Sequence, residues 1–169
     1  PFAAGAVYAI LSRSILVLLI ACVPGGAVAG PFIACLYDTV LRALRDAPGS
    51  WGANFRRAFR QNWRDAILPG ILTCLFLGAA AFCWMLLFVW PKVWPGLLMV
   101  VVYGFSCLLF FMIATLYWPQ LALFRLNNLG RLRNALLFAL KNFWRTLGVS
   151  LLQLGWCLLI VLLAPWSML

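Results

Sequence analysis

The sequence is poor in the residues that carry acid–base and metal chemistry. It contains no histidine, no glutamate and only three acidic residues, Asp38, Asp46 and Asp65. Neither a metal-ligand set nor a serine–histidine–aspartate arrangement can be assembled from so few groups. We therefore expect no catalytic residues, no metal site and no other cofactor, and a protein that is not an enzyme.

Charge of either sign is also scarce. Charged residues make up 9% of the 169 residues and apolar residues 66%, whereas a soluble domain is about half apolar and about a quarter charged. So few charges cannot cover a surface that faces water, so lipid must surround most side chains. The apolar segments extend over the whole length, which predicts one integral membrane domain over residues 1–169.

The cysteines do not suggest redox or metal chemistry. None belongs to a Cys-x-x-Cys pair, and all lie inside or beside apolar runs. Cysteine is a common small buried apolar residue, so we expect a packing role for all six. They are Cys22, Cys35, Cys74, Cys83, Cys107 and Cys157.

The first apolar run extends from Val7 to about Leu41, whereas a single membrane span needs about 20 residues. Pro24, Gly30 and Pro31 interrupt it, and each proline removes a backbone donor. We expect a helix break or kink at these three residues. Two arrangements remain open: one long broken span, or a helix followed by a shorter one from Phe32 to about Arg45.

A secretory signal is a third reading of this region. Arg13, the apolar stretch that follows it and the small residues 27–29 resemble a signal peptide with its cleavage site. The apolar run resumes directly after residue 29 and further apolar segments follow, so membrane spans are the favoured interpretation.

A basic segment follows the first run. Residues 51–66 predict an amphipathic helix with an aromatic and alanine face opposite four arginines. Such a helix lies in a membrane interface with its arginines toward lipid phosphates. The alternative, a solvated basic face packed on the bundle, is compatible with the first. The four arginines are Arg56, Arg57, Arg60 and Arg64.

The rest of the chain repeats this alternation of apolar and basic segments. Spans are predicted over residues 67–90, 97–123 and 146–166, the second of them broken near Pro119. A second basic helix is predicted from about Leu129 to Trp144. The fold class is therefore an all-α polytopic bundle with about four to five membrane helices and two basic amphipathic interfacial helices.

The distribution of basic residues predicts the orientation. Six arginines lie in residues 42–65 and five Lys or Arg in 125–145, but only one Lys in 91–95. By the positive-inside rule the two basic segments are cytoplasmic. Their side chains, close to apolar spans, favour anionic headgroups over nucleic acid as partners. In the second segment the predicted leaflet-facing or partner-facing residues are Arg131, Arg133, Lys141 and Arg145.

Four stretches together resemble the YesL-like membrane proteins of bacteria. They are Val-Pro…Gly-Pro-Phe-Ile-Ala-Cys-Leu-Tyr in residues 23–37, the Trp…Asn-Phe-Arg-Arg-Ala-Phe helix in 51–63, Tyr-Trp-Pro-Gln-Leu-Ala-Leu-Phe in 117–124, and the Asn and Arg-Thr-Leu positions of 134–147. Gln120 departs from the family's usual aliphatic residue. The resemblance implies a bacterial membrane domain of unknown function, often encoded beside carbohydrate-uptake ABC transporters, with no assigned site residues to carry over.

Three functions are compatible with these features. The favoured one is a non-catalytic accessory protein that associates with the permease subunits of a carbohydrate-uptake ABC system. The alternative is a small autonomous transporter or channel for a neutral solute, built on discontinuous helices, although no intramembrane charge marks an ion path. A membrane-bound regulator ranks third, because the external loop is short.

Overall fold

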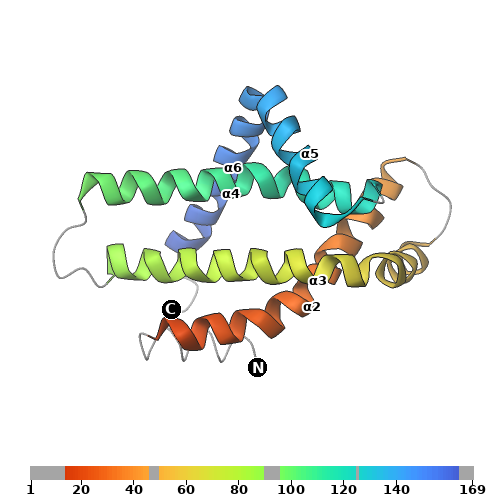
Figure 1. Cartoon of the computed structure of the whole chain (residues 1–169), viewed down its shortest axis with the longest axis horizontal. Helices are drawn as coiled ribbons and strands as arrows, with labels where there is room; N and C mark the ends of the chain where they lie inside the picture. Colours follow the sequence, from red (N-terminus) through yellow and green to blue (C-terminus); the bar gives the residue numbers. More distant parts are fainter. Residues whose placement is uncertain (1–13, 46–49, 90–95, 125, 164–169) are drawn as a thin grey trace.

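The computed structural model describes residues 14–45, 50–89, 96–124 and 126–163, and these residues form helices without any strand (Figure 1). The all-α prediction is therefore confirmed for this part of the chain. In chain order the elements are α2 (Ile15–Ala43), α3 (Trp51–Trp84), the short π-helix η1 (Met85–Val89), α4 (Leu97–Leu123), α5 (Asn128–Lys141) and α6 (Phe143–Leu163).

Three helical segments are long and apolar enough to cross a membrane: Ile15–Ala43, Trp51–Leu87 and Leu97–Leu123. They have the length and composition of the helices of a multi-pass membrane protein, as the apolar runs predicted. The bounds of α4 coincide with the span predicted there. The predicted loop between α3 and α4 and the predicted end of the last span, in residues 164–166, lie outside the described residues.

Helix α2 corrects the prediction of a break. It continues through Pro24, Gly30 and Pro31 as one helix of 29 residues, so a separate second helix from Phe32 is wrong. Its ribbon changes direction along its length (Figure 1), which fits a proline kink rather than an interruption. Proline is tolerated inside a membrane helix where neighbouring helices and local adjustments compensate for the lost backbone bond.

Helices α3 and α4 show the same continuity. The predicted amphipathic helix and the span after it form one helix, α3, of 34 residues that includes Pro69. At about 1.5 Å per residue it is about 51 Å long, well beyond the hydrocarbon core of about 30 Å. Pro119 lies inside α4 and does not end it, so the predicted break at Pro119 is also wrong.

The most extensive helix contact is between α2 and α3, and glycines make it possible. A methyl group at Gly26 would meet the Cα of Ile71 at 2.5 Å, and one at Gly30 would meet the Cα of Gly70 at 2.7 Å and the carbonyl oxygen of Ala66. Only residues without a side chain allow the two backbones to approach this closely. This crossing fixes the position of α2 on α3.

Helices α4 and α6 complete the arrangement. Phe110 of α4 stacks on Phe76 of α3 with ring centroids 4.0 Å apart. The hydroxyl of Thr115 on α4 lies 2.9 Å from the side-chain amide of Gln153 on α6, which joins these two helices. Helix α5 ends at Asn142, where the backbone leaves helical geometry, and α5 and α6 meet in a V (Figure 1).

Candidate functional site

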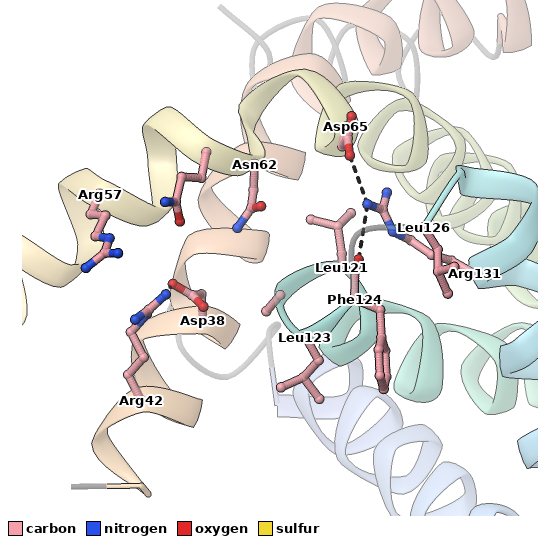
Figure 2. Close-up of a pocket in the computed structure, with 12 residues that line it drawn as sticks. Asp38, Arg42, Arg57, Asn62, Asp65, Leu121, Leu123, Phe124, Leu126 and Arg131 are labelled. Carbon is pink, nitrogen blue, oxygen red and sulfur yellow. Dashed lines mark hydrogen bonds and ion pairs between the residues drawn. The ribbon is translucent and has the colours of Figure 1, made fainter. Parts of the chain in front are cut away.

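Polar side chains gather at one end of the bundle. Because α2, α3 and α4 alternate in direction (Figure 1), the end of α2, the beginning of α3 and the end of α4 lie together. These segments and the first turn of α5 surround a cavity of about 530 Å³. Its charged lining, shown in Figure 2, consists of Asp38, Arg42, Arg57, Asp65 and Arg131.

The first ion pair in the cavity lies on α2. Asp38 and Arg42 are four residues apart, so they lie on the same helix face. The Nε of Arg42 donates to Oδ2 of Asp38 at 2.8 Å. The side chain of Asp38 is 7% exposed, and a carboxylate so removed from water needs this charged donor.

The second ion pair joins three helices. Arg131 of α5 donates from Nη2 to Oδ2 of Asp65 on α3 at 2.8 Å and to the carbonyl oxygen of Phe124, after the end of α4, at 3.4 Å. Its Nη1 donates to Oδ1 of Asn128 at 2.8 Å, and that oxygen also accepts from the hydroxyl of Tyr117 at 3.2 Å. The Nε of Arg131 is buried and has no hydrogen-bond partner among the described residues.

The burial of Arg131 corrects its predicted role. Its side chain is only 3% exposed, so it cannot face headgroups or a partner surface as the sequence analysis expected. Arg131 shares its helix face with Ala135 and Ala139, which are also buried. These positions recur every four residues, and the two alanines are a signal in the sequence that this face of α5 packs inward.

The other seven basic residues predicted for the interface are exposed. The guanidinium of Arg64 lies 5.3 Å from the ring centroid of Trp63, an arrangement typical of a cation–π contact. These seven residues are Arg56, Arg57, Arg60 and Arg64 of α3, Arg133 and Lys141 of α5, and Arg145 of α6.

The aromatic face of α3 divides between two environments. Phe55 and Phe59 pack against Phe32 of α2, with ring centroids 6.0 and 5.7 Å apart. Trp63 is 41% exposed. Part of this face therefore packs on the bundle, as the second reading of the basic segment proposed, and Trp63 remains available to a membrane interface.

The cavity was not predicted from the sequence, and no individual role was predicted for Asp38, Arg42 or Asp65. Two of the three acidic residues of the chain line the cavity, so the rarity of carboxylates was a usable signal. The spacing of Asp38 and Arg42 was another, whereas the approach of Asp65 to Arg131 depends on the tertiary fold.

The arrangement offers hydrogen-bond donors and charge rather than a reactive group. In the part of the chain that the structure covers, no three His, Cys, Asp or Glu side chains are placed to hold a metal ion. Comparison of the chain with models of protein families, with curated proteins and with solved structures finds no match.

Proposed function

We propose that this chain is a non-catalytic membrane accessory protein that docks the permease subunits of a carbohydrate-uptake ABC system through a basic face of α3. The observation that carries the proposal is the spacing of Arg56, Arg60 and Arg64, which recur every four residues and are all exposed. We call these three residues the arginine stripe. No ion pair to the stripe occurs among the described residues.

The arginine stripe destabilises α3 when no anionic group lies beside it. Like charges four residues apart destabilise a helix by about 0.2–0.5 kcal/mol for each pair. An anionic surface offsets that repulsion, and headgroups attract each basic residue with about 1 kcal/mol. A stripe of this kind supports an anionic contact surface, either the inner leaflet, an acidic patch on a partner, or both together.

The proposed topology places this surface in the cytoplasm of a bacterial cell. Helix α6, with 21 residues, is long enough to be a fourth span, and the distribution of arginines supports cytoplasmic basic ends. The resemblance to YesL-like proteins supports an ABC permease as the partner. The scarcity of catalytic residue types supports a docking role over chemistry.

The test is co-purification from native membranes in a mild detergent. Replacing Arg56, Arg60 and Arg64 together with Gln is expected to reduce recovery of permease subunits about tenfold, because each lost charge contact contributes about 0.5 kcal/mol or more. The matched control replaces the same three residues with Lys and retains the charge. Equal recovery with the Gln variant would argue against docking through the stripe.

The cavity favours a second candidate, a small carrier for a polar solute. Its volume of about 530 Å³ lies within the range of small-molecule sites. Helices α2, α3 and α4 are continuous through their prolines, so the cavity, and not a break in a helix, is the feature that favours this candidate. Solute flux into liposomes that contain the protein, above the flux into empty liposomes, would support this candidate over the accessory role.

A further inference from the structure

The charge balance of the cavity is positive. Three arginines and two aspartates line it, and each aspartate already accepts a hydrogen bond from an arginine at 2.8 Å. Arg57, the third arginine, forms no ion pair with any described residue. The cavity therefore has one uncompensated cation and no free carboxylate that would repel an anion.

Donors in the cavity are also incompletely used. The Nε of Arg131 has no acceptor among the described residues, but this atom is buried and out of reach of a headgroup. Arg42 donates its Nε to Asp38, and its terminal nitrogens form no hydrogen bond with another described residue. Figure 2 shows Asn62 between the two ion pairs, where its amide adds a further polar group. The guanidinium groups of Arg42 and Arg57 and the amide of Asn62 together favour a ligand with several acceptor oxygens.

Gln61 is a further polar residue of the lining, and the other lining residues are apolar. Leu121 is buried, whereas Leu123 and Leu126 are each 38% exposed and Phe124 is 48% exposed. These residues belong to the end of α4 and the segment after it, at the same end of the bundle as the basic start of α3 (Figure 2). A molecule that fills the cavity thus meets cationic donors on one side and alkyl groups on the other.

We infer that this cavity binds the headgroup of an anionic phospholipid, with the phosphate at Arg57 and the donors beside it. Guanidinium groups suit phosphate because their planar N–H pairs match its oxygens. The apolar wall suits the glycerol backbone and the first acyl methylenes. A zwitterionic headgroup fits less well, because it brings its own cation to a site that already has an excess of positive charge.

This lipid site lies beside the arginine stripe, since Arg57 also lines a second hollow with Arg56 and Arg60, but the cavity itself has a different lining. Arg57 lines the cavity, and Arg56, Arg60 and Arg64 do not. The inference does not depend on a permease partner. Loss of partner recovery and loss of lipid binding are therefore expected from different variants, and either proposal can fail alone.

The test measures binding of short-chain lipids to the purified full chain in detergent. Dihexanoyl phosphatidylglycerol is titrated while the thermal unfolding midpoint is recorded, with dihexanoyl phosphatidylcholine as the zwitterionic probe. We expect phosphatidylglycerol, but not phosphatidylcholine, to raise the unfolding midpoint in a saturable way. Arg57→Gln should weaken its apparent affinity about tenfold, the size of one lost charged hydrogen bond. Arg45→Gln removes the same charge from an exposed position after α2, at the same end of the bundle but outside both the cavity and the arginine stripe, and should change the affinity by less than about twofold.

Three results would overturn the inference. Equal weakening by Arg57→Gln and Arg45→Gln would show that surface charge, not the cavity, attracts the lipid. Equal stabilisation by both lipids would show that the net charge of the headgroup is not recognised. If glycerol 1-phosphate bound as tightly as the lipid, the cavity would be a site for a soluble phosphate ester, and the acyl chains would contribute nothing to binding.

Discussion

At the scale of single residues, Arg131 is a charged side chain that is almost fully buried. Its side chain is 3% exposed, whereas that of its partner Asp65 is 57% exposed. The desolvation cost therefore falls on the arginine and is offset by one carboxylate and two neutral oxygens, from Phe124 and Asn128. Removing the carboxylate would therefore leave a buried positive charge without its ion-pair partner.

The first residue-scale prediction concerns this pair. Asp65→Asn should lower the free energy of unfolding by about 2 kcal/mol, the typical value of a hydrogen bond to a charged group. Adding Arg131→Met to that variant removes the stranded cation and should recover part of the loss. Thermal unfolding in detergent measures both, and a double variant less stable than Asp65→Asn alone would contradict this account of Arg131.

At the scale of helices, the contact between α2 and α3 depends on small residues rather than on apolar bulk. In lipid there is no hydrophobic force that drives helices together, so close van der Waals packing takes its place. Gly26 and Gly30 on α2 face Ala66 and Gly70 on α3, and both pairs are four residues apart. Each helix thus presents a row of small residues to the other.

This packing gives the element-scale prediction. Gly30→Ala places a methyl group against the backbone of Gly70 and Ala66, which cannot move away as a flexible side chain can. We expect a loss of about 1–3 kcal/mol in stability, the usual cost of overpacking. Gly104→Ala on α4 is the matched control, because nothing lies within 4 Å of its added methyl group. Equal thermal unfolding midpoints for the two variants would contradict the proposed crossing.

Much of the helical arrangement could be predicted from hydropathy. The bounds of α4 coincide with the predicted span, and the basic start of α3 was predicted as an amphipathic helix. At Pro24 and Pro31 a break or a kink was predicted, and the helix continues with a change of direction; the break predicted at Pro119 was wrong. In both helices the loss of a backbone bond was weighed without the tertiary packing that compensates for it. The row from Gly26 to Gly30 was readable as a small-residue contact motif. The approach of Asp65 to Arg131 could not be predicted from the sequence, because the two residues are 66 positions apart.

At the scale of the whole molecule, alternating helix direction explains why charge gathers at one end. Helices α2 and α4 end where α3 begins, and the polar residues at these helix ends enclose the cavity. At the opposite end of the bundle, α4 begins after Gly96 with an apolar sequence. Among the described residues, the charged side chains around the cavity thus lie at one end of the bundle. In the proposed topology this end faces the cytoplasm, in accordance with the positive-inside rule.

The most direct test of this account is the accessibility of single cysteines in intact cells. The six native cysteines are replaced with Ala, and cysteine is introduced at Gly52, at the start of α3, or at Gly96, before α4. Both positions have open space around an added Cβ. We predict that a membrane-impermeant maleimide labels Gly96→Cys in intact cells and Gly52→Cys only after permeabilisation. Labelling of both variants in intact cells, or of Gly52→Cys alone, would contradict the proposed topology and with it the cytoplasmic assignment of the cavity and the arginine stripe.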